Sequence, residues 1–425
     1  MDDFFVKRLQ ALLIILSALI LPIHLAWAFD EFDTQHAKPR FALSFEDLTL
    51  EIKGRARIGL HDLSGKGGPE YDSPTDTATI GTRSPFVDLD SFDLAFRLNW
   101  NEMIWFNTNI AFTTSDTSLS AIYFEYKQDL NDWFSHGAEL GYQNPLFATH
   151  RHTIRYPLIA TQYWKNPEYH LAYGARFQLE ENTAIAIYLA ASFMRPLKSE
   201  PIHGSYQYAG SLKTLSYSSA KPFSGNSAAG SALLRLSSYG LSLEGIVQFG
   251  NIVTKDGINT LISDFIYYRS LPDFDPNQTS TMAWWAGARL AYNGYGVHIM
   301  GEFLASKEQL IERMGMYIQA SYTYKREAKF LNEFEILARY EQTWLNNSTN
   351  PIDDTHALRS QDTNNAISWD HKIITIAGKA HILDDILAIR LEYSFFLEDN
   401  GVPKLNIPNK SFDDDELLIL IEARY

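Results

Sequence analysis

The chain has 425 residues, no cysteine and a formal net charge of −15 at pH 7. An acidic excess of this size argues against nucleic acid as a partner, because nucleic-acid-binding proteins carry a basic face. Without cysteine an exported chain would have no disulfides, so its stability would have to come from its secondary structure and packing.

Residues 1–28 have the pattern of a secretory signal peptide. A basic pair at positions 7 and 8 precedes an apolar run over 12–25, and residues 26–28 (Ala-Trp-Ala) form a small-x-small cleavage site. We therefore expect the mature chain to begin with a short periplasmic lead-in over residues 29–47. A membrane-anchoring helix is the alternative, and beyond residue 28 there is no other run of about 18 apolar residues.

From residue 48 onward, apolar and polar residues alternate along the chain. Because successive side chains of a strand point to opposite faces, each alternating segment predicts a strand with one apolar and one polar face. We find about sixteen such segments between residues 48 and 425. Their apolar faces carry no Lys, Arg, Asp or Glu, and His136 is the one ionisable exception. A charge on a lipid-facing strand costs about 2–4 kcal/mol at the bilayer midplane, so the exclusion of charge indicates contact with lipid. The clearest segments are 48–60, 92–100, 104–112, 169–177, 185–193, 241–249, 284–292, 295–303 and 387–395.

The links between these segments alternate between short and long. The short links are Asn101-Glu102, Glu180-Glu181-Asn182, Tyr239-Gly240, Asn293-Gly294 and Leu383-Asp384-Asp385, and the long ones lie near 62–89, 144–167, 194–229, 251–281, 344–370 and 398–414. Tight turns on one side and long loops on the other are typical of an outer-membrane β-barrel.

We therefore predict an all-β fold, a transmembrane antiparallel up-and-down β-barrel of about 16 strands in one domain over residues 48–425. A barrel of this size has an aqueous lumen rather than a core filled with side chains. Eighteen strands are the alternative count, and Thr260–Tyr268 could supply an extra strand. If that segment instead belongs to a long external loop, short and long links still alternate along the whole chain.

The chain ends on the segment Leu417–Tyr425, whose alternate positions are apolar or aromatic, while Leu418 and Leu420 between them are apolar as well. The segment resembles the C-terminal strand of Gram-negative outer-membrane proteins. With the signal peptide and the asymmetric links, the whole mature chain resembles a trimeric-type porin. That resemblance implies the outer membrane of a Gram-negative bacterium, contact with outer-membrane lipid and lipopolysaccharide, and a homotrimer as the expected assembly.

The porin resemblance also implies that the third external loop, residues 144–167, folds inward and narrows the pore. This loop has no acidic residue, and its basic residues are His150, Arg151, His152, Arg155 and Lys165. A basic constriction would favour anions, because a narrow passage of low dielectric amplifies fixed charge. The alternative is a surface loop whose basic residues pair with neighbouring carboxylates or with lipopolysaccharide phosphates.

The polar strand faces would line the lumen. They could form an arginine ladder that binds phosphate or acidic sugars through bidentate contacts, or a set of mutually paired charges. The nearly balanced numbers of acids and bases favour mutual pairing. The candidate pore-lining residues are Arg55, Arg57, Arg97, Arg176, Arg289, Arg339, Arg390, Glu244 and Glu302, joined by Arg235, Glu51, Asp93, Glu139, Glu333, Glu335, Glu341 and Glu392.

The favoured hypothesis is a porin, a water-filled channel for passive diffusion of small hydrophilic solutes, with a preference for anionic solutes. The alternatives are an export channel for an acidic polysaccharide, an outer-membrane barrel enzyme and an adhesin. Nothing in the spacing of His170, His298 or His381 singles out a nucleophile, so we predict no catalytic residue. We also predict no cofactor and no metal, and assign the acidic run Asp413–Glu416 to solvated loop charge.

Overall fold

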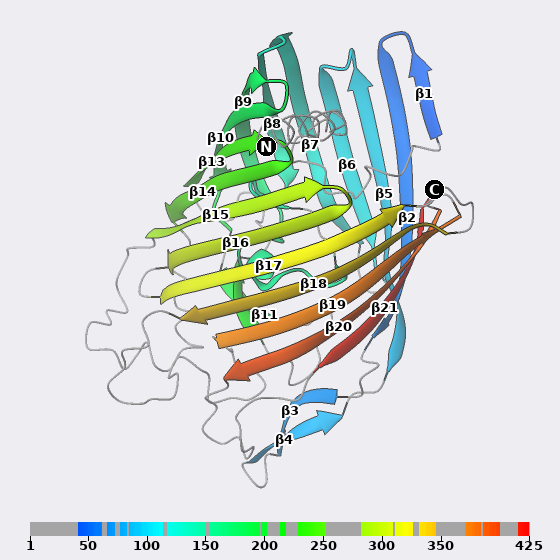
Figure 1. Ribbon diagram of the computed structural model, residues 1–425, viewed down its shortest axis with the longest axis vertical. Coiled ribbons are helices and arrows are strands. Elements are labelled where there is room, and N and C mark those ends of the chain that lie inside the picture. Colours follow the sequence, from blue (N-terminus) through cyan, green and yellow to red (C-terminus); the bar gives the residue numbers. More distant parts are fainter. Residues whose placement is uncertain are drawn as a thin grey trace, which may run out of the picture.

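The computed structural model describes residues 41–61, 66–72, 77–82, 85–113, 117–149, 153–195, 197–201, 213–217, 228–251, 282–308, 311–325, 331–345, 370–383, 386–399 and 415–424. Within these residues sixteen antiparallel strands form a closed barrel (Figure 1), which confirms the predicted fold class. The barrel strands are β2 (Leu48–His61), β5 (Phe86–Trp100), β6 (Ile104–Phe112), β7 (Thr117–Asn131), β8 (Phe134–Gln143), β9 (Glu168–Glu180), β10 (Thr183–Phe193), β13 (Ala228–Ser238), β14 (Leu241–Asn251), β15 (Met282–Gly294), β16 (Val297–Glu308), β17 (Ile311–Lys325), β18 (Leu331–Leu345), β19 (Asp370–Ile382), β20 (Leu387–Asp399) and β21 (Glu416–Arg424).

Each barrel strand pairs with the next one along the chain, and the last strand closes the ring. β21 lies beside β2 (Figure 1), with Leu60 opposite Ile419 and Arg55 opposite Arg424. Closure leaves the wall without the unpaired edges that an open sheet would expose. The segment Thr260–Tyr268, considered above as an extra strand, lies outside the described residues.

A further short strand, β1 (Phe41–Phe45), lies within the predicted lead-in. It pairs antiparallel with β2, with Phe41 opposite Ile52 and Phe45 opposite Leu48. β21 pairs with the other half of the same edge of β2, so β1 and β21 follow one another along that edge. Residues 1–40, including the predicted signal peptide, lie outside the described residues.

The tight turns at one end of the barrel are formed by residues with positive φ. Asn101 and Glu102 have φ of 54° and 55°, and Tyr239 and Gly240 have φ of 48° and 80°. Tyr239-Gly240 is a two-residue link of type I′, which requires positive φ at both central positions. The turn predicted at Asn293-Gly294 lies instead at Tyr295-Gly296, because residues 293 and 294 still pair with His298 and Val297. Gly296 supplies one of the positive φ values, 75°, at no steric cost.

Two small hairpins lie in the long links at the other end of the barrel. β3 (Lys66–Asp72) and β4 (Thr77–Thr82) form one of them and stand beyond the end of the wall (Figure 1). β11 (Leu197–Pro201) and β12 (Lys213–Tyr217) form the other. In the described part of the chain, no helix is long and apolar enough to cross a membrane.

The two faces of the wall differ as the alternation predicts. On β19, Ile374 and Ile376 are 39% and 56% exposed on the outer face, whereas the alternate residues Ile373 and Thr375 are fully buried on the lumen side. His136 lies on the outer face of β8, where its Nδ1 is 3.3 Å from the hydroxyl of Tyr173. An aromatic neighbour therefore provides a polar partner for His136.

Candidate functional site

The loop between β8 and β9, residues 144–167 (L3), is folded into the barrel. Its described residues include Leu146, Phe147, Tyr163 and Trp164, each at most 2% exposed. The ring of Phe147 meets that of Trp285 on β15 edge-on, with ring centres 4.3 Å apart. L3 therefore packs against the lumen side of the wall through an apolar cluster.

L3 contains a single turn of π-helix, η1 (Ala160–Trp164). The hydroxyl of Tyr163 lies 2.7 Å from Oγ of Ser306 on β16, and the guanidinium of Arg313 on β17 lies 4.8 Å from the centre of its ring. Burial raises the pKa of Tyr163 to about 12. The phenol is therefore neutral across the physiological range and serves as a packed anchor for the loop.

A buried network of two arginines and two glutamates fixes the middle of L3. Arg155 donates to Glu341 on β18 and, at 3.1 Å, to Oγ1 of Thr375 on β19. Arg339 lies 3.3 Å from the same Glu341 carboxylate. Glu392 on β20 accepts from the backbone N–H of Arg155 at 3.2 Å. Because the two positive and two negative side chains neutralise one another, Arg155 adds no free positive charge to the passage.

Ile154 of L3 packs against the last strand of the barrel, where it forms a buried cluster with Leu418 and Leu420. Leu420 is 1% exposed, whereas Ile421 beside it is 37% exposed on the outer face. Leu418 and Leu420 therefore face the lumen, and their apolar character serves the docking of L3.

The loop after β10 holds L3 from its other side. Oγ of Ser216 on β12 donates to the carbonyl of Thr161 at 2.6 Å, and Nδ2 of Asn166 donates to the carbonyl of Tyr217 at 2.8 Å. Arg195 donates to the carbonyl of Asn166 at 2.8 Å. L3 is therefore bound both to the wall and to this second inward hairpin.

Of the five basic loop residues predicted to form the constriction, two are described. Arg155 is buried in the network above, and Lys165 is half-buried at the end of L3. The other three, His150, Arg151 and His152, lie outside the described residues.

Most of the predicted lumen charges are mutually paired. Glu244 on β14 accepts from Arg235 at 2.6 Å and from Arg289 at 2.6 Å, and Arg289 in turn lies 3.2 Å from Glu302. These four residues occupy one register row across β13, β14, β15 and β16, so the row alternates in charge.

A second paired group lies where the barrel closes. Arg55 lies 2.9 Å from Asp93, and Arg57 lies 3.3 Å from both Asp93 and Asp90. Arg390 lies 3.7 Å from Glu422, a residue that sequence reasoning missed. The sequence could have predicted this residue, because Glu422 is a charged residue at a lumen-facing position within the largely apolar last segment.

Arg97 and Arg176 differ from the other predicted lumen arginines. The guanidinium of Arg97 lies 5.6 Å from the ring centre of Trp105, and Arg176 donates to Oε1 of Gln178 at 2.7 Å. Among the residues that the structure describes, neither arginine forms an ion pair. Both are half-buried, on β5 and β9. Positive charge without a neutralising carboxylate is therefore found on the wall formed by β5 to β9.

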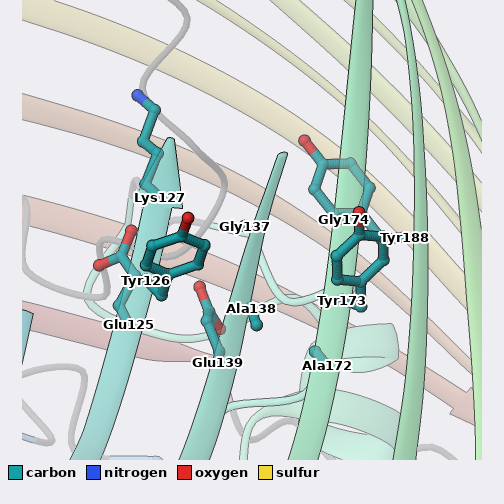
Figure 2. Close-up of a pocket in the computed structure, with 10 residues that line it drawn as sticks. All are labelled: Glu125, Tyr126, Lys127, Gly137, Ala138, Glu139, Ala172, Tyr173, Gly174 and Tyr188. Carbon is teal, nitrogen blue, oxygen red and sulfur yellow. The ribbon is translucent and has the colours of Figure 1, made fainter. Parts of the chain in front are cut away.

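This wall also contains a hollow between Lys127 and Tyr188 (Figure 2). Lys127, Gly137, Gly174 and Tyr188 follow one another in a single register row across β7, β8, β9 and β10. The two glycines have no side chain to fill the space between the longer residues, and Glu139 also lines the hollow (Figure 2). The wall formed by β5 to β9 is therefore uneven between Lys127 and Tyr188.

No protein-family model matches this chain, and no curated protein matches it. Solved structures are similar to it over most of its length. The outer membrane channel DcaP of Acinetobacter baumannii is 11% identical, with 90% of this chain and 99% of that chain covered and a TM-score of 0.53. OmpF of Salmonella typhi, solved with daunomycin, is 9% identical, with 91% and 100% covered and a TM-score of 0.51. OmpT, an outer membrane protein of Vibrio cholerae, is 8% identical, with 90% and 99% covered and a TM-score of 0.50. At these identities the likeness is one of fold, and the fold is that of the outer-membrane porins.

Proposed function

We propose that the protein is a porin in the outer membrane of a Gram-negative bacterium, a water-filled channel through which small hydrophilic solutes diffuse passively. The barrel size supports this function, because sixteen strands leave an aqueous lumen. The placement of L3 supports it too. The contacts of L3 with β15 to β21 dock it on one side of the barrel, and the polar wall of β5 to β9 lies on the other.

We further propose that the channel prefers anions, and one observation carries this preference. The arginines in contact with L3 are neutralised, whereas Arg97 and Arg176 on the facing wall form no ion pair with a described residue. Fixed positive charge beside a narrow aqueous passage raises the local concentration of anions. The uncompensated charge on β5 and β9 therefore favours anionic solutes.

The homotrimer and the contacts with lipopolysaccharide remain predictions from the porin resemblance. The alternatives of a polysaccharide exporter, a barrel enzyme and an adhesin differ from the porin in one testable respect. A porin passes small solutes without any partner. A polysaccharide exporter needs a partner protein, a barrel enzyme acts on a substrate, and an adhesin passes no solute.

Swelling of liposomes that contain the purified protein tests the proposed channel. In an isosmotic monosaccharide, we expect rapid swelling, because the solute enters with water. In an isosmotic tetrasaccharide, we expect little swelling, because L3 narrows the lumen. Liposomes without protein are the control. No swelling in the monosaccharide would contradict a diffusion pore and favour one of the alternatives.

A further inference from the structure

Three polar side chains on neighbouring strands of the β5–β9 wall have no hydrogen-bond or ion-pair partner among the described residues. They are Arg97 on β5 and Asn107 and Asn109 on β6, with Arg97 directly opposite Asn107. Nε of Arg97, Nδ2 of Asn107 and Oδ1 of Asn109 are shielded from solvent without a hydrogen-bond partner. Within the described part of the chain, none of the three side chains forms a hydrogen bond or an ion pair. Polar groups left unsatisfied in this way are costly, which suggests that another group binds there.

The surroundings of Arg97 explain why it stays unpaired. Glu51 lies directly opposite on β2, but its carboxylate is 3.8 Å from Nζ of Lys53. Trp105, diagonal to Arg97 across β5 and β6, places its ring 5.6 Å from the guanidinium carbon. A cation–π contact of this kind orients the guanidinium without using its N–H donors. Arg97 is therefore positioned and still able to bind an anion.

We propose that Arg97, Asn107 and Asn109 form a binding site for a small hydroxylated carboxylate, such as a uronate monosaccharide. A guanidinium binds a carboxylate through two parallel hydrogen bonds. Oδ1 of Asn107 and Nδ2 of Asn109, which are not among the shielded atoms, offer an acceptor and a donor to the hydroxyls. Asn107 and Asn109 are two residues apart on one face of a strand, roughly 7 Å, a span that one sugar ring bridges. The inference rests on the proposed porin function, because it places the site on the wall of the passage.

The charge of the site favours a monoanion over a doubly charged phosphate. It holds one guanidinium, which a single carboxylate neutralises, whereas the second charge of a phosphate would have no counter-ion among the three side chains. The two carboxamides carry no charge and would add little to the binding of a simple halide, which has no hydroxyl to pair with them. A solute that combines one carboxylate with several hydroxyls uses all three side chains.

Block of single-channel current in planar bilayers tests the site. The probes are galacturonate, galactose, which lacks the carboxylate, and acetate, which lacks the hydroxyls. We expect galacturonate to interrupt the current at lower concentration than either of the other two. Arg97→Gln should weaken the galacturonate block about tenfold or more, since it removes a charge-assisted pair of hydrogen bonds. Asn107→Ala and Asn109→Ala should each weaken it about threefold or more and leave the effect of acetate unchanged.

A matched control is Lys325→Gln, which also removes one positive charge, at a side chain that is 64% exposed near a turn. This variant should retain the galacturonate block. If the channel conducts but galacturonate and acetate block equally, or if the block survives Arg97→Gln, the site is refuted and the porin function stands. If the protein does not conduct, the porin function fails, and calorimetry with galacturonate on the detergent-solubilised protein then decides the site separately. Binding that Arg97→Gln abolishes would support the site, and no binding would refute it.

Discussion

The guanidinium of Arg155 on L3 donates to the carboxylate of Glu341 on β18, 186 residues further along the chain. Glu341 also accepts the backbone N–H of Leu158 at 2.5 Å, so one buried carboxylate holds two points of the loop. This contact joins L3 to the wall and at the same time removes the charge of the loop arginine from the passage. The same interaction therefore fixes the position of the loop and neutralises its arginine.

Replacing Glu341 by Ala should release L3. Removing one partner of a buried ion pair costs about 3–5 kcal/mol, because the other charge is left uncompensated, and here both Arg155 and Arg339 lose a partner. We expect larger current fluctuations in single-channel recordings and a lower free energy of unfolding in urea. Glu312→Ala is the control, because its pair with Lys307 is largely solvent-exposed. A quiet current together with unchanged stability in Glu341→Ala would contradict the role of this contact.

Ile154 and Leu420 should be energetically coupled. Truncation of a buried Leu or Ile to Ala costs about 2–5 kcal/mol. Because the two side chains belong to the same cluster, the Ile154→Ala, Leu420→Ala double variant should lose less stability than the sum of the single variants. Urea unfolding in lipid vesicles measures all four proteins of the cycle. Strictly additive losses would show that the two residues do not pack together.

The two faces of the wall should respond differently to a charge. Ile376→Arg places a guanidinium on the exposed outer face of β19 and should cost about 2–4 kcal/mol if that position lies at the bilayer midplane. Ala377→Arg, one residue further, places it on the lumen side opposite Glu392 and should cost less. The comparison of unfolding free energies in vesicles is the measurement. An equal loss in both variants would contradict the assignment of faces.

The docking of L3 should weaken at high pH because of Tyr163. Burial raises the pKa of Tyr163 to about 12, above the ordinary value of 10.0. The docked loop keeps the phenol neutral, so its stability is complete below pH 10 and is lost progressively between about pH 10 and 12, by about 3 kcal/mol. Current noise should therefore rise across this interval in the natural protein and rise less in Tyr163→Phe. The same rise in both proteins would assign the effect to other groups.

The sequence predicts the barrel well because alternation is a local pattern. Each strand has one apolar and one polar face in its own sequence. The number of strands and the end of the barrel at which the long loops lie can therefore be predicted without knowing which residues contact one another. The inward fold of L3 was expected from the porin resemblance and not from its own residues. The apolar pair Leu418 and Leu420 seemed irregular in a strand, and the structure explains it by the docking of Ile154.

The state of the individual charges could not be predicted in the same way. Arg155 is neutralised by Glu341, and no local pattern links two residues so far apart in the chain. Arg97 is opposite Glu51, which alone would predict an ion pair, but Lys53 on the same strand lies closer to that carboxylate. Side-chain competition of this kind depends on packing and is invisible in the order of residues.

The reversal potential of the purified channel under a KCl gradient tests most directly whether uncompensated arginines on the β5–β9 wall set its selectivity. We expect an anion-selective potential for the natural protein and a shift toward cations in the Arg97→Gln, Arg176→Gln double variant. Lys325→Gln, which removes an exposed positive charge, should leave the potential nearly unchanged. A cation-selective natural channel, or a double variant with the same potential as the natural protein, would contradict the proposed origin of the selectivity.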